Sequence, residues 1–453
     1  MNLEVEPVRA VDFGAFVRSR GGAGALVVQP RLGFGDPVLM RAGLAATKAA
    51  DATTVGTITL DSYTRVGDLE AAESALREGA PLNGYPIVSH ARAVTEGVLG
   101  GIRDVTFPVQ VRHGSAMPGD IFTALIELGI PATEGGPVSY CLPYGRTPLA
   151  ESVRNWAECC RRFAALRETG VEPHLETFGG CLLGQLCPPS QLVAMSVLEA
   201  LFFHQHGLRS ISVSYAQQTN LKQDVEAVLA LQRLCAELVP TGNLHIVVYA
   251  YMGVYPTTDH GAYRLLGQAA ELAVRTGAHR LIVKTVAESR RIPTIAENVA
   301  ALEYAGRVAD AILPTLPAGE IPAAGSATSR SLVGFGDSQT YAEARALVEA
   351  VLEVDQNVGR ALLGAFARGL LDIPYCVHPD NAARTRSFIA SDGRLCWADV
   401  GGLPLSRLVD THHTRRITSA DLLADLSYVR RTFDQPPERV LPGTPVDQGA
   451  IGV

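Results

Sequence analysis

The sequence predicts a (β/α)8 barrel, that is, a TIM barrel of class α/β, followed by a C-terminal extension of mixed α+β structure. The main observation is that eight short runs of apolar and β-branched residues alternate with longer stretches of helical periodicity. This alternation is typical of repeated βα units around a parallel sheet, and eight units are enough to close a barrel. The expected strands are residues 25–30, 54–60, 107–111, 129–133, 173–178, 210–215, 245–251 and 280–283.

The segments between these runs predict helices, and the character of the chain changes after residue 300. Helical spacing of apolar residues is clearest at 69–76, 148–166, 191–204, 221–238 and 262–276. Further on we expect a Pro/Ala-rich connector at 313–324, helices at 342–355 and 359–370, a mixed region at 387–390 and 394–397, and a helix at 419–431. We therefore assign residues 1–300 to the barrel and 301–453 to an extension that packs on it.

The composition indicates a folded protein without a general affinity for polyanions. The 453 residues are 47% hydrophobic and 19% charged, which supplies a sizeable core and carries no signature of disorder. A net charge of -7 gives no overall attraction to nucleic acid or to anionic membranes. We expect neither as a partner, so any anion has to be bound by a local cluster of positive side chains.

The cysteine pattern and the absence of targeting signals predict a cytoplasmic protein. The eight cysteines show neither a C-x-x-C pair nor the spacing of a zinc site, which is typical of reduced, mostly buried thiols. His90 and His113 stand outside any metal-ligand motif, so we expect no metal site. We find no secretory h-region and no uninterrupted apolar run of about 18 residues, so neither secretion nor a membrane span is expected.

Three arginines follow three consecutive predicted strands. Arg31, Arg65 and Arg112 stand where the first three strands end, and the chemistry of a barrel of this kind lies at the C-terminal ends of its strands. One such arginine is often only a surface residue, but three in succession are expected to converge on one mouth. Because a guanidinium group binds a carboxylate through two hydrogen bonds, three of them suit a ligand with two carboxylates.

Other polar residues at the strand ends extend this prediction to an amino dicarboxylate. Glu134 follows the fourth strand, where it can accept hydrogen bonds from an ammonium group or act as a catalytic base. Tyr140 and Tyr144 follow close behind, and Lys284 and Glu288 follow the eighth strand. We expect His113 to lie in or near the same site, beside Arg112.

At these residues the sequence resembles the large, epsilon subunit of glutamate mutase, also called methylaspartate mutase, an adenosylcobalamin-dependent enzyme. The matching segments occur in the order of the family from residue 29 to about residue 375. They are QPRLG, TLDSYTR, LNGYP, VQVRHG, TEGGPVSYCLPY, ETFGG, LCPPS, LIVKT and DIPY. The resemblance implies a TIM barrel, a radical rearrangement of L-glutamate to threo-3-methylaspartate, and adenosylcobalamin as the cofactor.

The resemblance also implies roles for individual residues. Glu134 matches the carboxylate that faces the substrate amino group and is our predicted catalytic residue, while Phe178 matches an aromatic residue beside the cofactor. The implied substrate-binding residues are Arg31, Arg65 and Arg112 for the two carboxylates, with Glu134, Tyr140 and Tyr144; the implied cofactor-binding residues are Phe178, Lys284 and Glu288, of which the last two contact the adenosyl ribose.

The same resemblance implies a partner subunit. In the family the cofactor lies between this barrel and a small cobalamin-binding subunit that carries the motif D-x-H-x-x-G, and that motif is absent here. The expected assembly is a hetero-oligomer, such as a heterotetramer, built on a homodimer of this chain. At 249–251 the chain has YAY where the family has a histidine-containing segment. We expect this difference to affect contacts to the corrin or to the small subunit and to leave the ring of substrate-binding residues untouched.

Three alternative functions remain open at this point. The chain can be a related cobalamin-dependent mutase acting on a different amino acid, or a barrel enzyme that binds a dicarboxylate or a phosphate without cobalamin. It can also be a non-catalytic assembly partner of a cobalamin-binding subunit. The presence of the three arginines, Glu134, Lys284 and Glu288 favours a working site for a ligand similar to glutamate.

Overall fold

The computed structural model describes residues 12–22, 24–182, 184–316, 338–409 and 417–436. At its centre is a sheet of eight parallel strands in the order β1-β8-β7-β6-β5-β4-β3-β2. A parallel bridge between Val28 and Thr54 joins the two ends of this sheet, which confirms the predicted barrel. The strands are β1 (Val27–Gln29), β2 (Gly56–Thr59), β3 (Val109–Arg112), β4 (Ala132–Gly135), β5 (His174–Thr177), β6 (Ser210–Ala216), β7 (Asn243–Tyr249) and β8 (Arg280–Ile282).

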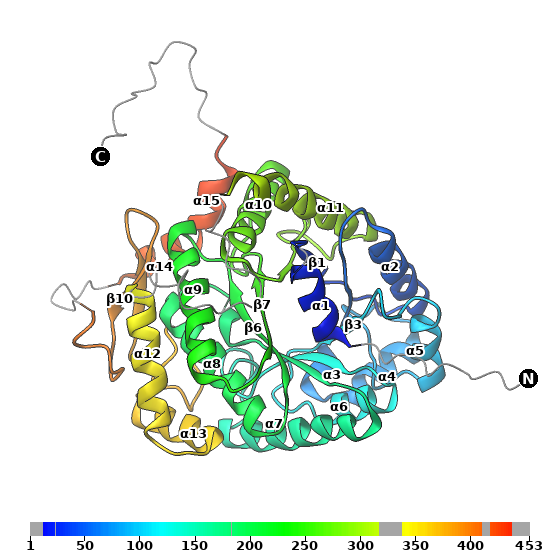
Figure 1. Ribbon diagram of the computed structural model, residues 1–453, viewed down its shortest axis with the longest axis horizontal. Coiled ribbons are helices and arrows are strands. Elements are labelled where there is room, and N and C mark those ends of the chain that lie inside the picture. Colours follow the sequence, from blue (N-terminus) through cyan, green and yellow to red (C-terminus); the bar gives the residue numbers. More distant parts are fainter. Residues whose placement is uncertain (1–11, 23, 183, 317–337, 410–416, 437–453) are drawn as a thin grey trace, which may run out of the picture.

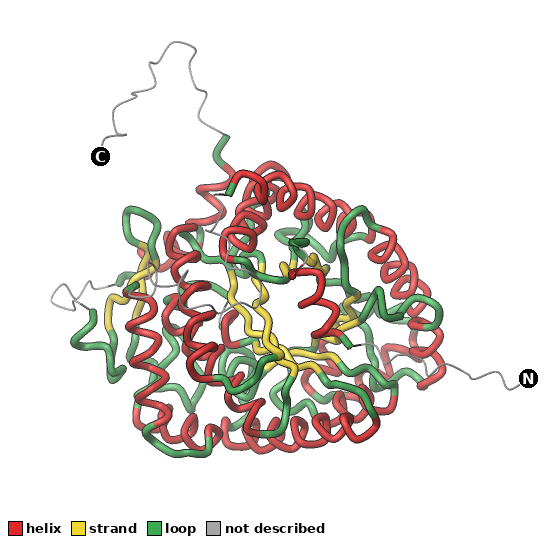
Figure 2. Tube along the Cα trace, viewed as in Figure 1, coloured by secondary structure: helices red, strands yellow, loops and turns green. Residues whose placement is uncertain are grey.

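Helices surround the strands, as Figure 2 shows in red around yellow. The last of them, α11, crosses the predicted division at residue 300 and packs against α10 and α2, so it completes the ring. Short 3-10 turns follow α7, β5 and α11. The helices of the ring are α2 (Pro37–Ala49), α3 (Ser62–Val66), α4 (Leu69–Glu78), α5 (Arg92–Leu99), α6 (Gly119–Glu127), α7 (Leu149–Ala164), α8 (Pro189–Gln205), α9 (Leu221–Leu238), α10 (Asp259–Thr276) and α11 (Ile295–Ile312).

A further helix, α1 (Phe13–Gly22), lies across the middle of the ring and contacts β1, β6 and β7 (Figure 1). Its Phe13 ring lies 5.1 Å from the ring of His174, which begins β5, and under the guanidinium of Arg280, which begins β8. Parallel strands of a barrel all begin at the same end. Helix α1 therefore covers the N-terminal end of the barrel.

Two strands differ from their predicted positions in a way that matters for the site. Strand β4 begins at Ala132 and not at residue 129, because Gly129 has a φ of 61° and belongs to the turn after α6. Glu134 therefore lies within β4 and not after it. Strand β7 covers 243–249 and not 245–251, since the backbone N–H of Tyr251 donates to the side chain of Gln217 at 3.1 Å.

The extension packs on one side of the ring. It contains α12 (Gln339–Leu352), α13 (Val358–Arg368), the antiparallel pair β9 (Arg386–Ile389) and β10 (Leu395–Asp399), and the helices α14 (Ser419–Leu426) and α15 (Tyr428–Asp434). Helix α12 contacts α8 and α9, α13 contacts α7 and α8, and α15 contacts α10. The helix predicted at 419–431 is thus two helices that meet at Ser427. Most of the connector predicted at 313–324 lies outside the described residues.

The cysteines behave as the sequence predicts. All eight lie within the described residues and have free thiols, and all but Cys396 are buried. Within the described part of the chain, no helix combines the length and the apolar character that a membrane crossing requires.

Candidate active site

The interior of the barrel contains a connected layer of fully buried polar side chains, which we call the polar layer. It consists of Gln29, Thr57, Gln110, Glu176, Ser212 and Arg280. The Glu176 carboxylate accepts hydrogen bonds from Arg280 Nη2, from Ser212 Oγ at 3.0 Å and from Gln110 Nε2 at 3.3 Å. Gln29 accepts from Arg280 Nη1 and donates to Gln110 Oε1 at 2.9 Å. The buried charges are therefore paired and hydrogen-bonded, as buried charges have to be.

Sequence reasoning missed the polar layer because it considered only residues that follow the strands. The available signal was a charged residue inside a predicted strand: Glu176 lies within 173–178, and Arg280 begins 280–283. A charged side chain inside a short apolar strand of a barrel is enclosed on either face, so it needs a partner from another strand. The sequence shows the need for a partner but does not say which residue supplies it.

Arg112 and Glu134 lie side by side at the C-terminal ends of β3 and β4. Arg112 Nη2 is 3.4 Å from Glu134 Oε2, and the Tyr140 hydroxyl donates to Glu134 Oε1. All three side chains are almost fully buried. Burial opposes the charge of Arg112, but the Glu134 carboxylate keeps its pKa above the ordinary value. Burial, together with the same carboxylate, also raises the pKa of Tyr140, so this phenol remains a hydrogen-bond donor at neutral pH.

Tyr249, the last residue of β7, joins this pair to the polar layer. Its hydroxyl lies 3.1 Å from Glu134 Oε2 and is hydrogen-bonded to Glu176 Oε1. Its ring lies under the guanidinium of Arg112, at 5.1 Å from the ring centre. The expectation that the difference at 249–251 leaves the predicted substrate-binding residues untouched is therefore wrong. Strand β7 ends two residues earlier than predicted, and Tyr249 at its end contacts Arg112 and Glu134.

Arg31, Lys284 and Glu288 form a second charged group at the mouth. Glu288 Oε2 lies 3.6 Å from Arg31 Nη1 and 3.4 Å from Lys284 Nζ. Burial lowers the pKa of Lys284 to about 8, and Arg31 and Arg112 act in the same direction against Glu288. Burial opposes the ionisation of Glu288, but Lys284 and Arg31 hold its pKa below the ordinary value. Lys284 Nζ also lies 5.0 Å from the ring centre of Tyr255, whose buried hydroxyl has no partner among the described residues.

Arg65 approaches the backbone that follows β3. A Cβ atom on Gly114, which has a φ of 78°, would lie 3.0 Å from Arg65 Nε, so glycine at this position permits the approach. His113 stacks on Trp156 at 5.6 Å, and its Nδ1 accepts from the backbone N–H of Ser115. Burial, followed by the charges of Arg65 and Arg112, lowers the pKa of His113 to about 3, so the imidazole is neutral. This agrees with the expected position of His113 at the site.

The predicted arginines share one property, which Arg280 of the polar layer also shows at its Nε. The Nε atoms of Arg31, Arg65 and Arg112 are all buried, and none has a hydrogen-bond partner among the described residues. Tyr144 is about half-exposed as a residue, and its hydroxyl is within electrostatic range of Arg31, Arg65 and Glu134. Buried donors without acceptors are costly in a folded protein. Their presence on three converging arginines fits a site that is completed by an anionic ligand.

The carboxylate of Glu199, from α8, packs against the loop that follows Glu134. A Cβ atom on Gly136 would lie 2.0 Å from Glu199 Oε1, and the same oxygen accepts from the backbone N–H of Ser139 at 3.0 Å. Glycine at this position is therefore required by the buried carboxylate. Burial raises the pKa of Glu199 to about 7. Sequence reasoning predicted a close backbone approach at this loop but did not identify Glu199 as the group that approaches.

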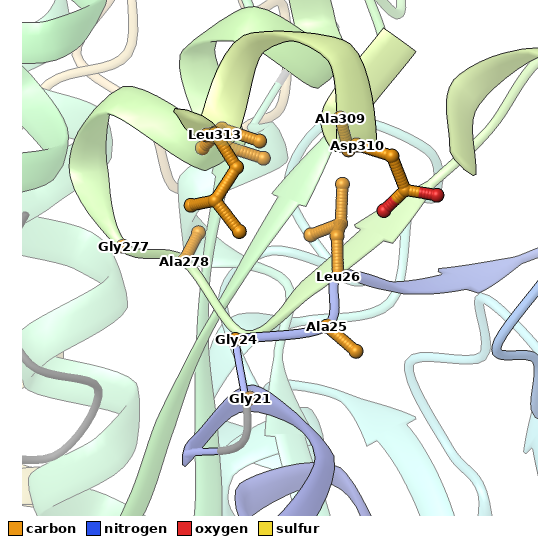
Figure 3. A pocket seen from close by; sticks show the side chains of 11 residues that line it. Gly21, Gly24, Ala25, Leu26, Gly277, Ala278, Ala309, Asp310 and Leu313 are labelled. Carbon is orange, nitrogen blue, oxygen red and sulfur yellow. The ribbon is translucent and has the colours of Figure 1, made fainter. Parts of the chain in front are cut away.

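A cavity of about 70 Å³ lies elsewhere, between the start of β1 and the C-terminal ends of α10 and α11 (Figure 3). Leu26 and Leu313 face it, and glycines and alanines form most of its wall. Asp310 is the only charged residue among those that line it. The cavity therefore offers none of the converging charges found at the mouth. Within the described residues, no group of three or more His, Cys, Asp and Glu side chains is arranged to hold a metal ion.

Comparison with known proteins identifies the family. Residues 9–422 match the family described as Methylaspartate mutase E chain (MutE). The chain belongs to this family. The glutamate mutase epsilon subunit of Halobacterium salinarum is 32% identical to it over 369 residues, which cover 79% of this chain and 74% of that protein. The glutamate mutase epsilon subunit of Escherichia coli O157:H7 is 28% identical over 372 residues, which cover 78% and 74% of the two chains.

Among solved structures, a truncated form of 3-deoxy-D-arabino-heptulosonate 7-phosphate synthase from Thermotoga maritima is similar, with a TM-score of 0.35 and 12% identity. The similarity covers 64% of this chain and 87% of that one. Membership of the MutE family confirms the resemblance that the ordered sequence motifs indicate.

In this MutE-family chain, the structure brings the predicted residues to one end of the barrel. Phe178 follows β5, is buried, and packs between Tyr140, with ring centres 4.7 Å apart, and Tyr249, at 5.7 Å. It therefore borders the Arg112 and Glu134 group directly. Lys284 and Glu288 are within electrostatic range of Arg112. Most of the predicted residues thus form two neighbouring groups, one around Glu134 and one around Glu288.

Proposed function

We propose that this chain is the catalytic subunit of an adenosylcobalamin-dependent mutase that interconverts L-glutamate and threo-3-methylaspartate. The observation that supports this most strongly is the convergence of Arg31, Arg65 and Arg112, each with an unpartnered Nε, beside Glu134 in a chain of the MutE family. This arrangement supplies positive charge for two carboxylates and one negative group for an ammonium, which is the charge pattern of an amino dicarboxylate.

The arginines and Glu134 bind and orient the substrate in this proposal. Arg112 and Glu134 already form an ion pair at 3.4 Å, so the substrate replaces part of that contact with its own carboxylate and ammonium groups. Tyr140 donates to Oε1 of Glu134 and helps to fix the direction in which the carboxylate faces. Because Arg112, Glu134 and Tyr140 are almost fully buried, their interactions with a bound ligand are stronger than they would be in water.

The group around Glu288 suits the sugar of a nucleoside. Lys284 and Glu288 provide a donor and an acceptor at adjoining positions, and vicinal hydroxyl groups need both. The unpartnered hydroxyl of Tyr255 lies beside them. When bound, adenosylcobalamin supplies an organic radical that can take a hydrogen atom from the substrate. The aromatic wall of Phe178, Tyr140 and Tyr249 excludes water from the space next to Glu134.

The proposal includes a partner. We propose a small cobalamin-binding subunit that carries D-x-H-x-x-G and covers the C-terminal end of the barrel, in a hetero-oligomer built on two copies of this chain. The charged groups described above open at this end, while α1 covers the other.

The test is a proton NMR assay under anaerobic conditions, with the purified chain, a cognate cobalamin-binding subunit, adenosylcobalamin and L-glutamate. A new methyl doublet from 3-methylaspartate, absent when either protein is omitted, is the expected result. If the cofactor binds the pair but no doublet forms, L-glutamate is not the substrate, and other amino acids become candidates. If the cofactor does not bind, the cobalamin assignment fails.

A matched pair of variants makes the assay specific for the site. Arg65→Ala removes a predicted carboxylate ligand, whereas Arg77→Ala removes an exposed arginine of α4. We expect the first variant to lose the doublet and the second to keep it. Equal activity of the two variants would contradict the role given to Arg65.

A further inference from the structure

We propose that Tyr249 is the positioning residue that sets the selectivity of the site for an amino dicarboxylate over a plain dicarboxylate. The inference rests on the proposed function and deepens it. Tyr249 contacts both halves of the substrate site at once: its ring faces Arg112 and its hydroxyl faces Glu134. It ends a different strand from both of these residues, so it fixes their relative position across the barrel.

The ring of Tyr249 supports the guanidinium group of Arg112. The guanidinium carbon lies 5.1 Å from the ring centre, which is within the range of a cation–π contact. The ring of Phe178 also packs against the Tyr249 ring, with ring centres 5.7 Å apart and an angle of 83° between the two planes. These contacts depend on the aromatic ring and not on the hydroxyl. A phenylalanine at this position therefore keeps the support for Arg112.

The hydroxyl of Tyr249 acts on Glu134. Glu134 Oε1 is held by the Tyr140 hydroxyl, and Oε2 lies 3.1 Å from the Tyr249 hydroxyl and 3.4 Å from Arg112 Nη2. With one oxygen on each tyrosine, the plane of the carboxylate is fixed. Without the Tyr249 hydroxyl, Oε2 has only the longer contact to Arg112, and the carboxylate turns toward that arginine and away from an incoming ammonium.

The hydroxyl is itself fixed by the polar layer. It is hydrogen-bonded to Glu176, which is paired with Arg280 and also accepts from Ser212 and Gln110. A hydroxyl has one proton, and two carboxylates lie within its reach. Glu176 is already compensated through Oε2 by Arg280, Ser212 and Gln110. The proton of Tyr249 therefore remains available to Glu134 when an ammonium group is bound there.

The experiment measures binding of two probes that differ only in the amino group, L-glutamate and glutarate. The protein is the full chain assembled with its cobalamin-binding subunit and a cobalamin that lacks the adenosyl group, so that neither probe is consumed. Affinities are measured by calorimetry for the wild type, for Tyr249→Phe and for Tyr251→Phe. Tyr251 is the matched control: it is buried two residues further on, in a cluster with Tyr255, Val429 and Phe433.

We expect the wild type and Tyr251→Phe to bind L-glutamate more tightly than glutarate. In Tyr249→Phe the affinity for L-glutamate is expected to fall by about tenfold, the usual effect of losing a hydrogen bond to a charged group, while that for glutarate changes by less than about threefold because the ring that supports Arg112 is kept. The thermal unfolding midpoint of Tyr249→Phe is expected to fall, because Glu176 Oε1 loses its hydrogen bond, and the affinities are therefore compared well below that midpoint.

Two contrary results have different meanings. If the wild type discriminates between the probes and Tyr249→Phe discriminates equally well, the role of Tyr249 is wrong and the proposed function stands. If the wild type binds both probes alike, the proposed substrate and the role of Tyr249 are both overturned. An equal loss of affinity for both probes in Tyr249→Phe also overturns the inference. It would show that the hydroxyl supports the whole site and not only the binding of the ammonium group.

Discussion

The two ends of the barrel bury different kinds of polar group. At the C-terminal end the groups are charged, and three arginines keep a buried Nε without a partner among the described residues. At the N-terminal end His174 donates or accepts through both ring nitrogens, to Ser210 Oγ at 2.9 Å and Ser212 Oγ at 3.0 Å, and stacks on His245 at 4.9 Å. Burial lowers the pKa of both histidines well below the ordinary value, so they are neutral.

This difference indicates which polar groups stabilise the fold and which are available to bind a ligand. The N-terminal end is closed by Phe13 of α1, and His174 finds partners for both ring nitrogens there, although His245 Nδ1 and Arg18 Nη1 have none among the described residues. The C-terminal end retains three arginine Nε atoms without a partner among the described residues, and these are available to a ligand. Glu176 and Arg280 of the polar layer lie between the two ends and have no exposed surface. Variants at the two ends and in the layer should therefore affect folding and binding to different degrees.

The largest expected effect is in the polar layer. Arg280→Met leaves Glu176 buried without its cation, and we expect the free energy of unfolding to fall by about 3 to 5 kcal/mol. Denaturant titration followed by circular dichroism measures this loss. The double variant Arg280→Met with Glu176→Gln should recover much of the stability, since no buried charge remains. If the double variant is as unstable as the single one, packing and not charge explains the loss.

At the C-terminal end, Arg65→Ala should affect binding and leave folding almost intact. We expect the transition-state stabilisation derived from kcat/KM for L-glutamate to fall by about 2 to 5 kcal/mol. The free energy of unfolding should change by less than about 0.5 kcal/mol, as at other sites without core contacts. A larger loss of folding stability would show that Arg65 serves the fold, and the contrast between the ends would fail.

Acid should destabilise the protein through neutral histidines at both ends. Burial lowers the pKa of His279 at the N-terminal end to about 4, and that of His113 at the mouth to about 3. Below pH 6.5 the unfolded chain takes up protons that the folded chain does not. The free energy of unfolding therefore falls as the pH drops from about 6.5 to 4, on the order of 3 kcal/mol for each histidine.

Denaturant titrations at several pH values measure this slope. His279→Gln and His113→Gln should each flatten it. If only one of the two does so, the other histidine is not held neutral in the folded state.

The smallest expected effect concerns Lys284. Its folded pKa of about 8 lies below the value of an unfolded lysine, so the unfolded chain binds more protons between pH 8 and about 10.4. The free energy of unfolding should rise in this window, by about 1 kcal/mol between pH 8 and 9. The same measurement on Lys284→Met should show no such rise. A rise that persists in the variant would assign it to another group.

Prediction from the sequence was most successful for features that local patterns encode. Alternating apolar runs and helical stretches gave the eight strands, and residues just past those runs gave Arg31, Arg65 and the Lys284 group. The boundaries were less successful. Glu134 was expected after β4 and lies within it, because the turn at Gly129 delays the start of the strand. Tyr249 was expected to be remote from the ring of arginines and contacts it.

The sequence by itself determined the barrel, the family and the concentration of charge at one set of strand ends. Only the tertiary structure decided which charges meet. Glu134 and Tyr249 are 115 residues apart in the chain, and Glu176 and Arg280 are 104 apart. Such pairs depend on which face of each strand points to the barrel axis and on the stagger between strands. A local sequence pattern carries neither, because each is fixed only when the sheet closes on itself.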